Sequence, residues 1–156
     1  MSDMTTDPAS SPAPGGAWVC EAGLVGAALA QPVVAPLDEL GVIAVEGADA
    51  SSFLHAQLTN DVAGLDAVRV QLNGYCSAKG RLLAVFDNWR DGDAICLQLP
   101  REILPAVLKR LSMFVLRAKA RLRDASGEWR CQAIVGPGSA RALAPGGTLP
   151  AAGDTV

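Results

Sequence analysis

The sequence predicts an α+β domain in which two helices pack on a mixed, mostly antiparallel sheet. Several short segments alternate between apolar and polar residues, which is typical of strands, whereas two longer segments carry apolar residues at helical spacing. An Asp-Gly pair at residues 91–92 marks a hairpin turn between two apolar runs, and hairpins join antiparallel strands. Because 50% of the 156 residues are hydrophobic, the chain has ample material for one core.

The predicted order of elements is β-α-β-β-β-α-β-β. The first strand is the continuous apolar run 41–46, which Gly47 ends. The first helix starts from a capping side chain, Asp49 or Ser51, and its apolar residues fall on one face. It ends at the Thr-Asn-Asp cluster 59–61, because such side chains compete for backbone hydrogen bonds.

Three strands follow this helix. Residues 68–72 alternate between apolar and polar side chains and predict a half-exposed strand. The loop 74–81 leads into the continuous apolar strand 82–86. The Asp-Gly turn then reverses the chain into the strand 94–99. We expect these strands to form antiparallel hairpins, since short connections join them.

The second helix starts at Pro100, and apolar residues recur along it at helical spacing as far as Val115. A last strand is predicted at residues 129–135. Between them, strict alternation predicts a strand at 117–123 whose outward face is a basic strip of four cations: Arg117, Lys119, Arg121 and Arg123.

Residues 38–136 form the predicted domain. Residues 1–37 are rich in Ala, Pro, Gly and Ser, so we expect a disordered or loosely ordered leader. Residues 137–156 predict an irregular tail, and we expect the chain to be truncated before later domains. The acidic amino terminus does not resemble a signal peptide and no apolar stretch is long enough for a bilayer, so we expect a cytoplasmic protein that does not associate with membranes.

Composition argues against several chemistries. The net charge of −3 gives no reason to expect nucleic-acid binding, and the basic strip lacks interleaved aromatic residues. The four cysteines form no CxxC pair, so we expect buried or half-buried thiols and no metal site. With the single His55, a histidine-based metal site or a Ser-His-Asp arrangement is hard to build.

The loop 74–81 is the segment best suited to a ligand. Its two glycines, Lys79 and Arg81 would present backbone N–H groups and cations to an anionic or heteroaromatic ligand, although the spacing is not that of a P-loop. The same residues also suit an ordinary connection with solvated charges. The cluster 59–61 and the basic strip also suit either ligand contacts or a purely structural role, since helix ends and edge strands carry such residues for structural reasons.

Long co-linear stretches of the chain resemble the amino-terminal part of YgfZ-type proteins, relatives of the glycine-cleavage T-protein, an aminomethyltransferase. The resemblance covers about residues 38–124 and implies the amino-terminal part of the aminomethyltransferase folate-binding fold. It also implies a role in maintaining iron–sulfur cluster enzymes and a link to tRNA modification. The matching stretches are GVIAVEGADASSFLHAQLTNDV (41–62), GYCSAKGRLL (74–83), LPRE (99–102) and LKRLSMFVLRAK (108–119).

The cofactor that the resemblance implies is tetrahydrofolate or a derivative, in a central cavity shared by several domains. Amide and carboxylate side chains would hydrogen-bond the pterin edge, a tyrosine ring would stack on it, and cations would meet the glutamate carboxylates. Reduced folate and iron–sulfur enzymes are the expected partners. The residues expected to contact the cofactor are Asn60, Asp61, Asn73, Tyr75, Lys79 and Arg81.

Two departures from the family shape the predicted function. T-protein enzymes carry acidic residues just after the glycines of this loop, whereas residues 80–85 hold none, so we expect no catalysis. A Lys-Gly-Cys-Tyr-x-Gly-Gln-Glu segment found later in YgfZ proteins does not occur. The predicted function is a non-catalytic folate-binding accessory protein. The alternatives are a folate-dependent aminomethyltransferase and a ligand-free protein-interaction module that docks through the basic strip.

Overall fold

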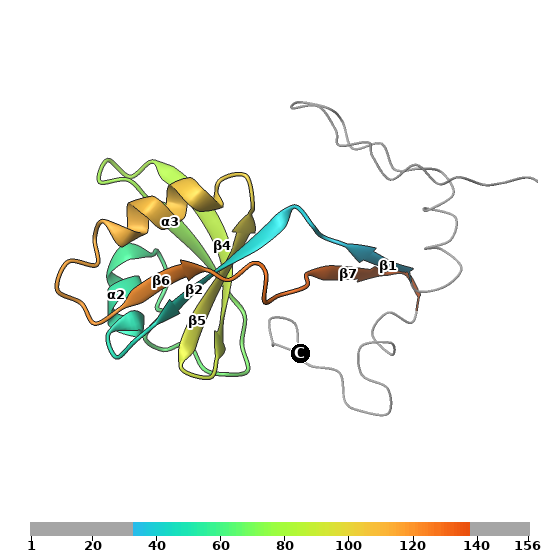
Figure 1. Cartoon of the computed structure of the whole chain (residues 1–156), viewed down its shortest axis with the longest axis horizontal. Coiled ribbons are helices and arrows are strands. Elements are labelled where there is room, and N and C mark those ends of the chain that lie inside the picture. The colour runs from blue at the N-terminus through green and yellow to red at the C-terminus, as the bar shows by residue number, and fades with distance from the viewer. Residues whose placement is uncertain (1–32, 138–156) are drawn as a thin grey trace, which may run out of the picture.

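The computed structural model describes residues 33–137, which form a sheet with two helices packed on it and a two-stranded ribbon that extends from one end (Figure 1). From β2 onward the order of elements is β-α-β-β-β-α-β-β, as the sequence predicts. The elements are β1 (Val33–Pro36), β2 (Leu40–Glu46), α2 (Ala50–Gln57), β3 (Gln71–Cys76), β4 (Leu82–Asp91), β5 (Ala94–Pro100), α3 (Leu104–Ser112), β6 (Arg121–Asp124) and β7 (Gln132–Val135).

The main sheet has five strands in the order β3-β4-β5-β2-β6. Every pairing between these strands is antiparallel. The predicted Asp-Gly turn joins β4 to β5, and Gly92 adopts a φ of 56° there, which a side chain would disfavour. Three strands therefore follow one another as hairpins, while β2 pairs with both β5 and β6 and brings the two halves of the sequence together.

Both helices lie on one face of the sheet (Figure 1). The alternation of strand side chains sends Ile43 of β2 and Leu97 of β5 to that face, where both are fully buried. From α3, Leu104 and Leu111 are buried against them. Burying one such aliphatic side chain stabilises the fold by about 1.5–3 kcal/mol, so this face holds the main core.

The other face of the sheet carries a smaller cluster and remains partly open. Its buried members include Val42, Trp89 and Cys96, and Ala125 packs on them from the segment that follows β6. This segment covers only part of the face. The uncovered part is where the candidate site described below lies.

The second predicted strand, which corresponds to β3, is shifted, and its inward and outward faces are exchanged. The sequence predicts a strand at 68–72, but β3 spans Gln71–Cys76 and includes residues assigned to the loop. Val68 and Leu72 are 61% and 60% exposed, whereas Asn73 is buried. The pattern misled because Asn73 is hydrogen-bonded inside the domain, so a polar residue occupies an inward position.

The boundaries of the second helix and of the strand after it also differ from the prediction. Pro100 belongs to β5, where it pairs with Leu40, and α3 begins at Leu104. The strand predicted at 117–123 is shorter and later, because residues 115–120 turn rather than extend. Leu116 adopts a φ of 43° in this turn, which is incompatible with a strand.

A strand that the sequence does not predict, β1, lies in the segment expected to be loosely ordered. It pairs antiparallel with β7, Val33 opposite Val135, in a two-stranded sheet separate from the main one. The last predicted strand is accordingly reduced from 129–135 to Gln132–Val135. The remainder of the predicted leader, 1–32, and all but the first residue of the predicted tail lie outside the described residues.

Neither α2 nor α3 is long and apolar enough to span a membrane, and these are the helices within residues 33–137.

Candidate functional site

The predicted ligand contacts lie on three neighbouring segments. Asn60 and Asp61 follow α2, Asn73 and Tyr75 belong to β3, and Lys79 and Arg81 lie in the turn between β3 and β4. The segment after α2 runs along the outer edge of β3, where Leu58 bridges Tyr75. The structure thus brings the first two segments into contact, while the two cations lie further along the hairpin.

Asn73 is 1% exposed and its amide serves the interior of the domain. Its Oδ1 accepts the backbone N–H of Asn60 at 2.7 Å. Its Nδ2 donates to Gln71 Oε1 and to Asn88 Oδ1, each at 2.7 Å. These bonds use the acceptor and both donors of the amide, so in this structure Asn73 positions the segment after α2 and offers no group to a ligand.

Asn60 and Asp61 shape the chain around the edge of the sheet. The Asn60 side chain donates to the Leu72 carbonyl. The Asp61 carboxylate accepts the Gly64 N–H at 3.1 Å and lies 3.2 Å from His55 Nδ1. Asp61 is exposed, so its remaining acceptor capacity faces solvent.

Tyr75 is 2% exposed and belongs to the main core. In this structure the ring packs inside the domain and is not presented at the surface, so its stacking on a ligand stays a prediction. Its position follows from the exchanged faces of β3, since Tyr75 and Asn73 share the inward side.

Lys79 and Arg81 are exposed in the hairpin turn. The Ser77 hydroxyl accepts the Arg81 N–H at 3.1 Å, and Gly80 supplies a φ of 74° that closes the turn. Both cations are therefore presented to solvent by an ordered turn. Binding of a ligand by the six predicted residues stays a prediction.

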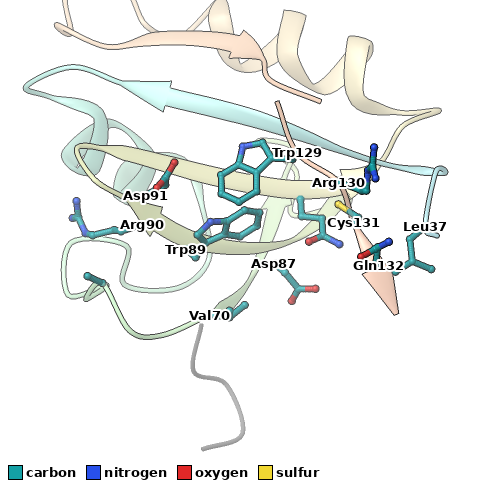
Figure 2. A pocket seen from close by; sticks show the side chains of 12 residues that line it. Leu37, Val70, Asp87, Trp89, Arg90, Asp91, Trp129, Arg130, Cys131 and Gln132 are labelled. Carbon is teal, nitrogen blue, oxygen red and sulfur yellow. The ribbon is translucent and has the colours of Figure 1, made fainter. Parts of the chain in front are cut away.

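A cavity of about 560 Å³ lies on the partly open face of the sheet, between β4 and the segment that leads to β7 (Figure 2). Two tryptophans form part of its wall. Trp89 is 8% and Trp129 36% exposed, and their rings meet edge to face with centroids 5.1 Å apart. One ring thus supports the other, which remains accessible from the cavity.

Polar side chains border the same cavity. Asp87 and Gln98 come from adjacent strands and are paired in register, so their side chains lie on the same face of the sheet. Arg130 and Asp91 add opposite charges at its rim. Arg90 is engaged elsewhere, since it donates to the Leu65 carbonyl and the Ser51 hydroxyl. The cavity therefore combines flat apolar surface with hydrogen-bond donors and acceptors.

The tryptophans are the residues that sequence reasoning missed. Trp89 could have been found from the length of β4, because a strand that extends to Asp91 places residues 85, 87 and 89 on one face. The prediction ended this strand at residue 86. Trp129 carried no such signal, since it lies outside the strands and reaches the cavity only through the path of the chain after β6.

The cysteines in the described part of the chain are free thiols. Burial raises the pKa of Cys96 to about 11, and it also raises the pKa of Cys131, which borders the cavity. Cys76 is half-buried, as predicted, whereas Cys20 lies outside the described residues. Residues 33–137 contain no cluster of three or more His, Cys, Asp or Glu side chains that would hold a metal ion.

Comparison with known proteins supports the resemblance. The chain is 34% identical over 95 residues to the tRNA-modifying protein YgfZ of Vibrio vulnificus, a match that covers 61% of this chain and 29% of that protein. It is 30% identical over 100 residues to the tRNA-modifying protein YgfZ of Colwellia psychrerythraea, covering 64% of this chain and 31% of that protein. The chain therefore spans less than a third of the length of these curated relatives. No family model matches the sequence.

The fold matches a solved aminomethyltransferase. The crystal structure of the glycine cleavage system aminomethyltransferase T from Bartonella henselae superposes with a TM-score of 0.67 and 21% identity, and the match covers 76% of this chain and 32% of that chain. At this identity the likeness establishes the fold, which is the one that the sequence predicts.

Proposed function

We propose, from its YgfZ-like sequence and aminomethyltransferase-type fold, that this chain binds a reduced folate as a non-catalytic accessory protein. The observation that supports this most directly is the cavity beside Trp89 and Trp129. A pterin is a flat heteroaromatic ring with hydrogen-bond donors and acceptors along its edge. The cavity provides an aromatic surface for stacking and side chains that form hydrogen bonds.

The residues around the cavity fit such a ring. Trp129 offers a partly exposed aromatic surface for stacking, worth about 0.5–1.5 kcal/mol beyond the area it buries. The Asp87 carboxylate would accept pterin N–H groups, and the Gln98 amide would both donate and accept. We therefore assign the pterin to these three residues.

The cations of the hairpin turn fit the other end of a folate. Arg81 directly precedes β4 and lies six residues before Asp87, a span of roughly 20 Å at the rise of an extended strand. A folate with its glutamate tail reaches over a similar length. Lys79 and Arg81 would then pair with the glutamate carboxylates, while Asn60, Asp61, Asn73 and Tyr75 hold the shape of the hairpin beneath.

The non-catalytic part of the proposal rests on the strand that follows the turn. Bound folate supplies a carrier for one-carbon units, but residues 80–85 hold no acid to move a proton at the carrier nitrogen. Val85 is 43% exposed on the open face, where an isopropyl group has no acid–base function. Asp87 is the first acid beyond the turn, and the proposal gives it a binding role.

The proposed cellular role follows the named relatives, which are tRNA-modifying proteins. The chain would act in the cytoplasm, where folate binding supports the maintenance of iron–sulfur cluster enzymes and a tRNA modification linked to them. Iron–sulfur enzymes would be its protein partners.

Anaerobic calorimetric titration with tetrahydrofolate, together with tryptophan fluorescence, tests this proposal. We expect saturable heat and quenching of Trp129. Trp129→Ala should weaken binding up to roughly tenfold, and Lys79→Ala with Arg81→Ala by about two- to fivefold, since exposed ion pairs contribute little. Arg110→Ala is the matched control, because Arg110 is exposed on α3, which packs on the opposite face of the sheet from the cavity.

Two results would overturn the proposal. Absence of tetrahydrofolate binding would remove the folate assignment. Tetrahydrofolate-dependent glycine-cleavage activity would leave binding intact and contradict the non-catalytic part.

A further inference from the structure

Much of the positive charge of the chain is concentrated in one segment. Residues 103–123 hold six of the 13 Lys and Arg residues and none of the 16 Asp and Glu residues. This segment therefore carries +6 and the remainder of the chain −9. It includes all of α3, the connection to β6 and β6 except its last residue, Asp124. We call residues 109–121 the cationic corner.

The structure separates the cations of this segment into two kinds. Arg123 is half-buried and bonded to the carboxylates of Glu46 and Glu128, so it serves the fold. The remaining five are exposed, and none takes part in an ion pair with another described residue. They are Lys109, Arg110, Arg117, Lys119 and Arg121.

Large apolar side chains stand exposed among these cations. Met113, Phe114 and Leu116 are 58%, 45% and 87% exposed. They are not the buried side of α3, which consists of Leu104, Val107 and Leu111. A purely solvated basic surface has no need of three such side chains within four residues.

The backbone holds this arrangement in place. Leu116 has a φ of 43°, a conformation that costs a leucine free energy and that glycine or asparagine would adopt more readily. Lys119 N–H donates to Asp49 Oδ2 at 2.7 Å, and Asp49 N–H donates to the Lys119 carbonyl at 3.2 Å. The connection is thus fixed to the start of α2 and presented in one conformation.

Figure 1 shows the connection between α3 and β6 at the end of the sheet opposite the β1–β7 ribbon. The tryptophan cavity lies on the other face of the sheet from the helices. The corner is therefore a surface separate from the proposed folate site.

We propose that the cationic corner docks an acidic segment of a partner protein that carries an apolar side chain. Leu116 and Phe114 would be covered by the apolar side chain, while Arg117 and Lys119 beside them pair with flanking carboxylates. Because the connection is already ordered, docking costs little conformational entropy.

A short acidic segment fits this surface better than an extended polyanion. A membrane or a long nucleic acid would reach beyond the corner and meet the acids of the remaining chain, which carries −9. Charges within about 8–10 Å of each other are incompletely screened at physiological salt. Asp49 and Glu46 lie next to the corner and would oppose such a surface.

The test uses the whole 156-residue chain labelled with ¹⁵N and a short synthetic peptide of Glu and Asp around a central Leu-Phe pair. We expect shift changes confined to the corner, and affinity that falls with added salt. The same peptide with Ser-Ser at its centre should bind roughly tenfold more weakly. Phosphatidylserine vesicles and a short single-stranded RNA are titrated in parallel.

Two variants separate docking from folding. Leu116→Gly should weaken binding of the Leu-Phe peptide while leaving stability unchanged or higher, because glycine relieves the positive φ. Arg117→Glu should also weaken it, whereas Arg69→Glu, an exposed cation elsewhere, should not. Stronger binding to vesicles or RNA than to the peptide would overturn the proposal, as would no shift changes at millimolar peptide.

Discussion

Single residues show where polar groups enter the interior of this domain. Asn73 and Asn88 are 1% and 0% exposed, and they are joined by a hydrogen bond between β3 and β4. The Nδ2 of Asn88 finds no acceptor among residues 33–137. Burying an amide with one open donor costs free energy, so the bonds that Asn73 does make are needed to offset that cost.

Asn73→Ala should therefore lower the free energy of unfolding by about 2 kcal/mol, because it leaves the buried Asn88 Oδ1 without its donor and removes the acceptor of the partly buried Asn60 N–H. Urea unfolding followed by circular dichroism measures this. Gln132→Ala, an exposed change on β7, is the control and should stay within about 0.5 kcal/mol of the parent. Equal values for the two variants would contradict a supporting role for Asn73.

The hydrogen bonds to Asp124 should make the free energy of unfolding depend on pH in the acid range. The hydroxyl and N–H of Ser126 both donate to its carboxylate, and these bonds hold the pKa of Asp124 below its ordinary value of 3.8. A lowered folded-state pKa means that the stabilisation is fully present above pH 3.8 and is lost as the pH falls through the folded-state value.

Ser126→Ala should reduce stability at neutral pH and flatten its fall below pH 3.8. The measurement is the free energy of unfolding at a series of acidic pH values. A variant that loses stability in parallel with the parent at every pH would show that Ser126 acts only through its bond to the Val42 N–H.

Two glycines with positive φ offer a matched comparison. Gly47 has a φ of 114°, and a Cβ there would lie 2.2 Å from the Lys119 carbonyl oxygen. Gly80 has a φ of 74° and open space around the same position. Gly80→Ala should cost about 1 kcal/mol from backbone strain alone. Gly47→Ala should cost more and shift the Lys119 amide resonance, and equal costs would contradict the steric argument.

At the scale of elements, the β1–β7 ribbon should be the least protected part of the described sheet structure. Each strand has four residues, and an isolated pair of strands is marginally stable in water. Amide hydrogen exchange should therefore be much faster at residues 132–135 than at residues 42–45 of β2, which pairs on both sides. Comparable protection in the two segments would show that the ribbon is anchored by further contacts.

The elements also show what the sequence was able to predict. The Asp-Gly turn identified β5, and periodicity identified α3, whose buried apolar residues face one core. Periodicity failed for β3, where a hydrogen-bonded network replaces apolar contacts. It also failed at 115–120, where the alternation of apolar and polar residues continues through a turn. The cavity was out of reach because Trp129 meets Trp89 through tertiary folding, which no local pattern encodes.

At the scale of the whole molecule, the open face of the sheet should cause weak self-association. Leu72 and Val85 are 60% and 43% exposed and are diagonal neighbours on β3 and β4. An apolar patch of this kind favours contacts between molecules. Leu72→Thr with Val85→Thr should reduce concentration-dependent association in sedimentation velocity while threonine keeps the strand propensity.

Val135→Thr provides the control for this experiment, since Val135 is 53% exposed but lies on the ribbon. A similar decrease in association for this variant would place the contact on the ribbon and not on the sheet. Association that persists in both variants would point to another surface, such as the cationic corner.

The pairing of β1 with β7 has a consequence for protein engineering. Val33 lies directly opposite Val135, so the chain enters and leaves the described region at neighbouring points. A folded unit whose entry and exit are adjacent can be spliced into a surface loop of an unrelated host without stretching either protein. Residues 33–137 are thus a candidate cassette for insertion, and the host's own fold would hold the two strands together at their open end.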